Sequence, residues 1–458
     1  MNMKTSNLIY TVLLCTAVSC GPLGKYKPVT NVDDSMYGRG VALTDTSSNM
    51  ARLGWKEVFT DPALQCLIDS ALTGNPDLQM AGERVHQAEA MLLGAKMAYL
   101  PSVAATPNIS GTVMQGAAPS FSYNLVGMAD WQIDIFGKLA TKVRSSKASL
   151  AQSEDYSQAV RVSVISQVAN IYYLLMMLDE QLGTSKEMEA VWKKSVETIN
   201  LIKREGFADE VAVKQYEATY ENMKVTSLEL EKQIIQAENA MSMLLGKPGQ
   251  TIVRGTFATQ TAPAGLNAGI PVQMLTYRPD VRSAQRACEV AFYQTKSAWL
   301  NFFPTLSISG NPAGLTNAFG ATVPMTAIAN LSANLVAPIL SAGVNKANLK
   351  YAQSAQREAG MAFDKAMLTA CREVNDAMID YNTCSAKMVH YETQVENLQK
   401  ARNDTEYLMQ NSEGKTYLDV LTAHNALINA KFEMIANKAQ RMQAMIAFYT
   451  ALGGGSEY

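Results

Sequence analysis

Three stretches of the chain place hydrophobic residues at alternating steps of three and four positions. Their members are Val164, Val168, Ile171, Leu175, Leu178 and Leu182; then Leu230, Ile234, Ala237, Met241 and Leu244; then Ile428, Phe432, Ile435, Ala439, Met442, Ile446 and Tyr449. This heptad spacing keeps one helix face turned toward a neighbouring helix. The pattern therefore predicts long helices that coil around one another.

The first member of each predicted helix pair is very long. Residues 137–203 contain no proline and one interior glycine, Gly183, and residues 343–410 are similar. At 1.5 Å per residue each would extend roughly 100 Å. The turns that follow carry Gly206 and Gly414, and a glycine suits the end of a helix. We therefore expect both glycines to shape the tips of two helical hairpins.

The hydrophobic period shortens to two after Pro101. Over residues 121–135 the alternate positions are Phe121, Tyr123, Leu125, Gly127, Ala129, Trp131, Ile133 and Ile135, with mostly polar residues between them. Such alternation predicts a strand, and residues 102–114 are predicted to be its hairpin partner. Residues 305–312 and 328–340 predict a second strand hairpin.

Two motifs recur at one spacing and indicate an internal duplication. Asn75-Pro76-Asp77-Leu78 returns as Arg278-Pro279-Asp280-Val281, and Tyr99-Leu100-Pro101 returns as Phe302-Phe303-Pro304, both 203 residues later (75 to 278, 101 to 304). A period this long exceeds that of solenoid repeats. We predict two tandem repeats, residues 61–260 and 261–453, followed by a tail at 454–458. Each repeat is expected to hold a strand hairpin and a long coiled-coil helix pair.

The N-terminus has the features of an export signal. Lys4 precedes a short apolar run over residues 8–18, which ends in Ala17-Val18-Ser19-Cys20. This end resembles a bacterial lipobox, so residues 1–19 are predicted to be a lipoprotein signal peptide and Cys20 to be acylated. Residues 20–60 would form an extended, lipid-anchored leader. The alternative is an ordinary secretory signal that ends near a cysteine.

Charge and motif content argue against several classes of function. The 39 basic and 41 acidic residues nearly balance, which gives no sign of a nucleic-acid partner. The three histidines are far apart in the sequence, and no phosphate-binding loop, nucleophile motif or metal-ligand spacing is present. We expect neither an enzyme nor a cofactor, apart from the covalent lipid on Cys20.

The number of predicted strands points to an oligomer. Four strands leave unpaired edges, whereas membrane barrels need about eight strands or more. In a bilayer every backbone group must be paired, so several chains would have to share one barrel. Three copies would supply twelve strands.

Several short motifs together resemble the TolC-type outer-membrane efflux proteins. Besides the duplicated motifs, the matching segments are residues 131–137, Gln167-Val168-Ala169, Leu244-Leu245-Gly246, residues 417–421 and Asn429-Ala430-Lys431. The likeness extends over residues 55–453. With Cys20, it fits the lipoprotein branch that serves pumps of the RND type.

The resemblance implies a mainly α fold with membrane β structure, assembled as a homotrimer with a twelve-strand barrel and a long α-helical barrel. It implies location in the outer membrane, with periplasmic extension and contact with outer-membrane lipid, a periplasmic adaptor and an inner-membrane RND transporter. The implied function is the passive exit duct of a tripartite multidrug efflux system. Two alternatives are the exit duct of a type I protein secretion system and a lipid-anchored periplasmic coiled-coil scaffold without a pore.

The resemblance also suggests residues for a periplasmic gate. Asp419 falls on the motif where family members place acidic side chains, although Thr422 stands where a second acid is frequent. Asp209 and Glu210 occupy the corresponding place in the first repeat. A close ring of carboxylates would bind cations. The alternative is that all three are solvated carboxylates at helix starts, stabilised by the helix dipole.

Overall fold

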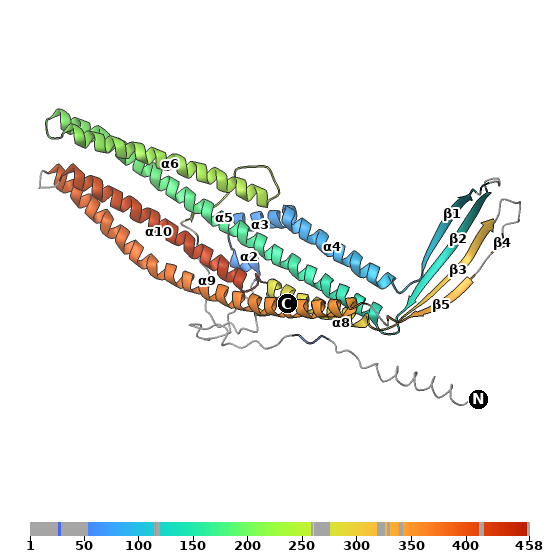
Figure 1. Ribbon diagram of the computed structural model, residues 1–458. Helices are drawn as coiled ribbons and strands as arrows, with labels where there is room; N and C mark the ends of the chain where they lie inside the picture. Colours follow the sequence, from blue (N-terminus) through green and yellow to red (C-terminus); the bar gives the residue numbers. More distant parts are fainter. Residues whose placement is uncertain are drawn as a thin grey trace. The chain divides into compact units, whose positions relative to one another are not determined.

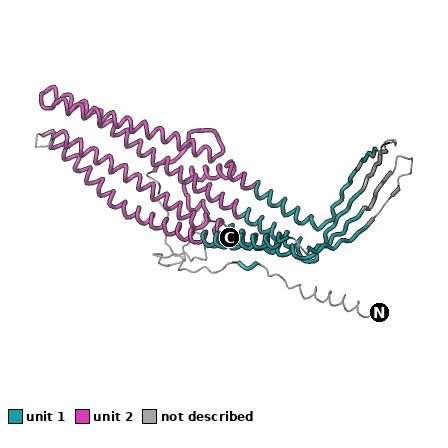
Figure 2. The backbone as a smooth tube through the Cα atoms, in the orientation of Figure 1, with its two compact units in different colours: residues 1–30, 83–154, 283–365 teal, residues 31–82, 155–282, 366–458 magenta. Residues whose placement is uncertain are grey.

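The computed structural model describes residues 26–28, 54–113, 115, 120–257, 260, 275–317, 326–327, 330–338, 342–411 and 416–455. Cys20 and Gly414 lie outside these residues. The chain divides into two compact units (Figure 2). One holds residues 1–30, 83–154 and 283–365, and the other holds residues 31–82, 155–282 and 366–458. Each unit takes segments from both predicted repeats.

The order of a 22-residue helix, strands and a long helix pair occurs twice along the described chain (Figure 1). The first series is α2 (Trp55–Val58), α3 (Pro62–Gly74), α4 (Pro76–Met97), β1 (Ser102–Thr112), β2 (Ser120–Ile133), α5 (Lys138–Arg204) and α6 (Glu210–Leu244). The second is α8 (Pro279–Leu300), β3 (Thr305–Asn317), β4 (Thr326–Ala327), β5 (Asn330–Val336), α9 (Val344–Gln410) and α10 (Tyr417–Ala451).

Corresponding helices have equal lengths. Helices α4 and α8 have 22 residues each, α5 and α9 have 67 each, and α6 and α10 have 35 each. Helix α5 lies one residue from its predicted position. An 18-residue window within it, with mean hydropathy 1.3, is long and apolar enough to cross a membrane by composition, but 61% of that window is buried in the protein. Such burial is typical of a helix in a protein core.

All the strands among the described residues belong to one antiparallel sheet. The order is β1-β2-β3, and β4 and β5 both pair with β3. β4 pairs with one end of β3 and β5 with the other, so they form one interrupted strand position beside it. The sheet therefore has four strand positions. The central pair, β2 and β3, joins the two halves of the chain.

The second strand hairpin differs from its prediction. β3 was expected to end at Pro312 but continues to Asn317. Of the predicted strand 328–340, residues 330–336 form β5 and residues 337–338 are not in a strand, whereas 328–329 and 339–340 lie outside the described residues. Gly310 pairs with Ala129 and Ala313 with Gly127, so the ladder shifts register beside Pro312. Proline has no N–H to donate, and such an irregularity lets a strand continue through it.

In the second unit, the C-terminal end of each helix pair is bound by a side chain that lies just before another helix. We call each of these two contacts a joint. Asn75 donates from Nδ2 to the carbonyl of Leu244 at 2.8 Å, at the end of α6. Arg278 donates from Nη1 to the carbonyl of Ala451 at 2.9 Å, at the end of α10. Carbonyls at a helix end have no partner within the helix, so these side chains supply one.

At both joints a glycine follows the returning helix, which is the second helix of the pair, α6 or α10. Gly246 has φ +65° and Gly453 has φ +97°, conformations that other L-residues rarely adopt. At Gly246 an added Cβ would lie 2.2 Å from the carbonyl oxygen of Gly74. The recurring motifs at the starts of α4 and α8 therefore lie against the ends of α6 and α10.

Candidate functional site

The tip of the first helical hairpin is a tight turn between α5 and α6. Gly206 has φ +83°, its N–H donates to the carbonyl of Lys203 at 2.9 Å, and the N–H of Phe207 donates to that of Ile202 at 3.1 Å. These bonds satisfy carbonyls at the end of α5. The side chain of Phe207 is 84% exposed at this tip.

The two acidic residues of the first tip have different partners. Asp209 is the N-cap of α6, and its carboxylate accepts from the N–H of Ala212 at 2.8 Å. Glu210 is exposed and forms ion pairs with Lys203 and Lys214. The hydrogen bond and charge of Lys203 hold the pKa of Glu210 below its usual value. Both carboxylates thus lie at the start of α6, where negative charge is favourable.

The acidic residue of the second tip belongs to a capping box. Thr416 is the N-cap of α10, and Asp419 accepts from its N–H at 2.8 Å and from its hydroxyl at 2.9 Å. Asp419 is half-buried, whereas Thr422 is exposed. These two hydrogen bonds hold the Asp419 carboxylate against the start of α10.

The two tips are connected through Tyr417. Its hydroxyl donates to the carboxylate of Asp209 at 3.4 Å, and its carbonyl accepts from the hydroxyl of Tyr216 at 3.1 Å. The structure therefore brings Asp209 of the first tip and the start of α10 together. Glu210 is engaged within the first tip instead, with Lys203 and Lys214.

A buried cluster lies behind the tips. Its core consists of Met188, Trp192, Ile199, Ala212, Val213, Tyr216, Met223 and Ile428. Within it Trp192 contacts His424 and Tyr216, with ring centroids 5.2 and 5.6 Å apart. None of these residues belongs to a motif that indicates a function. His424 could have been noticed from the sequence, because it lies four residues before Ile428 in a predicted heptad seam. A polar side chain at a buried position of a coiled coil is costly and therefore needs an explanation.

The sheet has one apolar and one polar face. Because cross-strand partners share a face, the register groups Val103, Ala129, Trp131, Ile308, Leu331, Ala333 and Leu335 on one side. The opposite side carries Ser102, Asp130, Gln132, Ser307, Ser309, Ser332 and Asn334. On the apolar face, Val103 is 74% exposed and Leu331 is 84% exposed. Large exposed apolar surfaces mark contact with a partner or a membrane.

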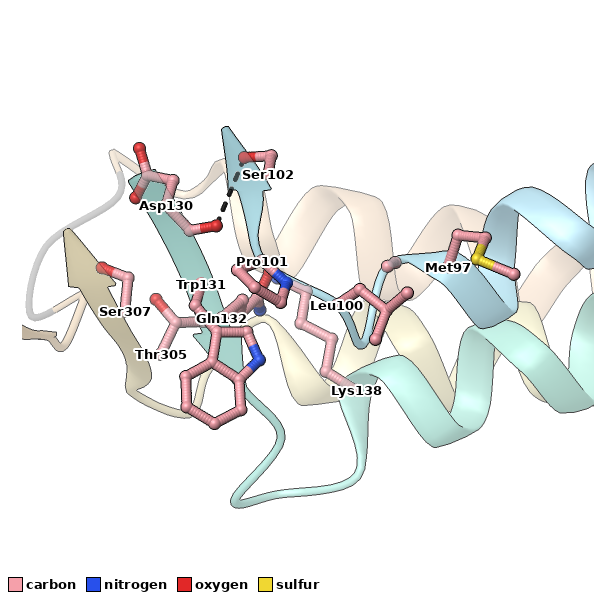
Figure 3. Close-up of a pocket in the computed structure, with 11 residues that line it drawn as sticks. Met97, Leu100, Pro101, Ser102, Asp130, Trp131, Gln132, Lys138, Thr305 and Ser307 are labelled. Atoms are coloured by element: carbon pink, nitrogen blue, oxygen red, sulfur yellow. Dashed lines mark hydrogen bonds between the residues drawn. The ribbon is translucent and has the colours of Figure 1, made fainter. Parts of the chain in front are cut away.

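A recess of about 740 Å³ lies where the strands meet the helices of the first unit (Figure 3). Ser102, Asp130, Gln132 and Ser307 line it from the polar face of the sheet. Beside it, the indole of Trp131 donates to the carbonyl of Tyr99 at 2.9 Å and fixes the helix-to-strand turn. Among the described residues, no three His, Cys, Asp or Glu side chains are placed to hold a metal ion.

Comparison with known proteins identifies the family. The sequence profile described as outer membrane efflux protein matches residues 67–247 and 270–454. The chain belongs to the outer membrane efflux protein family. The two matched segments lie close to the bounds of the two predicted repeats.

Curated relatives of this outer membrane efflux protein cover nearly its whole length. The cation efflux system protein CusC of Escherichia coli is 26% identical over 424 residues, which cover 90% of this chain and 91% of CusC. The toluene efflux pump outer membrane protein TtgC of Pseudomonas putida is 27% identical over 486 residues, which cover 99% and 96%. The probable outer membrane lipoprotein SilC of Salmonella typhimurium is 25% identical over 421 residues, which cover 90% of each chain.

Solved structures share the fold. A crystal structure of CusC superposes with a TM-score of 0.82 at 23% identity and covers 94% of this chain and 99% of its own. The open-state outer membrane channel MtrE of Neisseria gonorrhoeae gives a TM-score of 0.82 at 23% identity, with 94% and 98% covered. The predicted resemblance, the mainly helical fold with an antiparallel sheet, the outer-membrane location and the efflux function are therefore confirmed.

Proposed function

We propose that this outer membrane efflux protein forms a homotrimer with a shared twelve-strand barrel and a long helical tunnel. In this proposal the trimer is the passive exit duct of a tripartite RND-type system. It receives small molecules through a periplasmic adaptor and an inner-membrane transporter. Cys20 carries the lipid anchor.

The amphipathic sheet with two unpaired edges is the observation that supports the shared barrel. Within the described residues, β1 pairs with β2, and β5 pairs with β3, so each has an outer edge without a strand. A bilayer offers no hydrogen bonds to such edges. Pairing the four strand positions of one copy with those of two others closes the ring, with the apolar face toward lipid and the polar face toward water.

The long helices support the tunnel. Helices of 67 residues reach about 100 Å, roughly three times the 30 Å hydrocarbon thickness of a bilayer. Such helices are long enough to extend from a membrane-embedded barrel far into an aqueous compartment. Their tips then present Asp419, Asp209 and Glu210, which we propose as gate residues, with Gly206 and Gly414 shaping the turns. Three copies would place like charges close together, which favours cation binding.

The names of relatives support a lipid anchor and an efflux role. SilC is described as a probable outer membrane lipoprotein. Mass spectrometry of the mature N-terminal peptide tests the anchor. We expect a peptide that begins at an acylated Cys20, and a Cys20→Ala variant without acyl mass. A mature wild-type chain that begins elsewhere would contradict the lipobox assignment.

Adjacent residues of β5 provide a matched test of the barrel. Leu331 belongs to the apolar face and Ser332 to the polar face, and both are exposed in the single chain. A lysine toward lipid costs about 2–4 kcal/mol at mid-bilayer, whereas a lysine toward water costs little. Leu331→Lys should sharply reduce the amount of trimer in isolated outer membranes. Ser332→Lys should leave that amount unchanged and shift ion selectivity toward anions. Equal assembly of both variants would contradict the proposed orientation of the sheet.

A further inference from the structure

A buried histidine lies where the two helical hairpins meet in the second unit. The side chain of His424, on α10, is 1% exposed. Its Nε2 lies 2.5 Å from a carboxylate oxygen of Glu406 on α9. Its ring also packs against that of Trp192 on α5, which is fully buried. One titratable side chain therefore contacts helices of both hairpins.

Four helices supply neighbours of His424, and the charged and titratable ones lie on α9, α6 and α10. On α9, Glu406 faces the ring, and Arg402 Nη1 lies 3.9 Å from Glu406, so one positive and one negative charge are present. On α6, burial raises the pKa of Tyr216 to about 12, which keeps this phenol neutral. On α5 the neighbour is the uncharged indole of Trp192. On α10 itself, Asp419 lies five residues earlier and is held by the capping box.

This surrounding favours the neutral imidazole. A carboxylate is an acceptor, so the proton of neutral His424 belongs on Nε2, facing Glu406. A second proton would go to Nδ1, which is buried and has no hydrogen-bond partner. Nε1 of Trp192 is also buried without a hydrogen-bond partner. Protonation would add a poorly solvated charge and an unsatisfied donor.

We propose that His424, with Glu406 and Trp192, forms a pH-sensitive latch between the two hairpins. The neutral ring holds the hairpins together, and protonation separates them and widens the opening between the tips. The latch rests on the proposed function, because it regulates a duct with a gate at these tips. Its ligand is the proton of the surrounding aqueous compartment.

Burial determines the direction of the pH response. Desolvation lowers the pKa of His424, and this effect outweighs the opposing influence of Glu406. Once the hairpins separate and water reaches the ring, its pKa returns toward about 6.5. The separated state therefore binds protons more readily. Above about pH 6.5 the closed contact is unaffected, and it weakens as the pH falls from there toward the lower pKa of the buried ring.

Fluorescence of Trp192 tests protonation of the latch directly. The chain has four tryptophans, and the changes Trp55→Phe, Trp131→Phe and Trp299→Phe leave Trp192 as the single emitter. We expect its emission to change by at least a quarter between pH 7.5 and pH 5. The further change His424→Gln, which keeps a side-chain N–H donor for Glu406, should remove this transition. A transition that persists with His424→Gln would overturn the proposal.

Conductance of the trimer in planar bilayers tests the effect on the gate. For the wild type we expect at least a twofold rise in open-channel current from pH 7.5 to pH 5.5, and for His424→Gln no rise. Asp419→Asn is the control, since it removes a carboxylate from the tip, leaves His424, Glu406 and Trp192 in place, and should retain the rise. An equal rise in His424→Gln would overturn the latch. A trimer that never conducts would contradict the duct itself, and the fluorescence titration would still decide whether His424 titrates as proposed.

Discussion

The two helical hairpins have the same backbone plan and different chemistry at their ends. Both combine a 67-residue helix with a 35-residue returning helix. At the first tip, Asp209 caps α6 and Glu210 is held in exposed ion pairs. At the second, Thr416 and Asp419 form a capping box in front of the buried His424. The same backbone arrangement therefore accommodates exposed ion pairs at the first tip and a buried titratable side chain behind the second tip.

The joints at the other ends of the hairpins show the same kind of difference. Asn75 satisfies the end of α6 with one neutral hydrogen bond. Arg278 does so at the end of α10 and also binds the carboxylates of Asp280 and Glu373, each at 2.7 Å. We infer that the joint at the end of α10 depends more strongly on charge than the joint at the end of α6.

The largest expected effect follows from removing Arg278. Arg278→Ala leaves two carboxylates and the carbonyl of Ala451 without their shared donor, and loss of one partner of a buried pair costs about 3–5 kcal/mol. Because both carboxylates are partly exposed, we expect a loss near the lower end. Thermal unfolding of the purified protein measures it. Arg278→Lys is the control and should recover part of the stability, since it keeps the charge. A midpoint unchanged in Arg278→Ala would contradict the role of this joint.

The equivalent change in the first half should cost less. Asn75→Ala removes one donor to a buried carbonyl and the acceptor for the N–H of Leu78, which predicts a loss of about 1–3 kcal/mol. The same thermal unfolding experiment compares it with Arg278→Ala. A larger loss in Asn75→Ala than in Arg278→Ala would reverse our comparison of the two joints.

The caps give smaller effects on stability and distinguish the tips by function. Asp209→Ala removes the N-cap of α6, and Asp419→Ala removes the carboxylate that completes the capping box of α10, each at a cost of about 1 kcal/mol. We expect Asp419→Ala to raise single-channel conductance or to lower its block by divalent cations, and Asp209→Ala to do so less. If neither conductance nor block changes in Asp419→Ala, this residue does not line the gate.

The exposed ion pairs of the first tip should have the smallest effect. Glu210→Gln removes the partner of Lys203 and Lys214, but all three side chains are well solvated. Exposed pairs of this kind contribute little to stability. We expect an unfolding midpoint indistinguishable from that of the wild type. A clear decrease would show that the first tip also depends on charge.

The heptad pattern predicted the long helices accurately because it records local contacts that repeat along the chain. Residues 137–203 were expected and Lys138–Arg204 is observed. The first strand hairpin was similarly predictable. The end of β3 was not, because proline commonly interrupts a strand, and the continuation past Pro312 appears only in the pairing of β3 with β2 and β4. The β2 neighbours of that continuation are more than 180 residues away in the sequence.

The site residues depend on contacts that no short motif encodes. The motif of Asp419 could be recognised from its sequence, but its capping bonds to Thr416 required the structure. His424 meets Trp192 across 232 positions of sequence (192 to 424) and was dismissed because the histidines are far apart from one another. Its importance lies in burial, which arises when two hairpins from different halves of the chain pack together.

Planar-bilayer conductance of the detergent-extracted, size-characterised oligomer tests whether three copies form an outer-membrane duct. We expect a trimer that gives discrete current steps, partly blocked by divalent cations. A protein that remains monomeric and carries no current would contradict the shared barrel and favour a lipid-anchored coiled-coil scaffold.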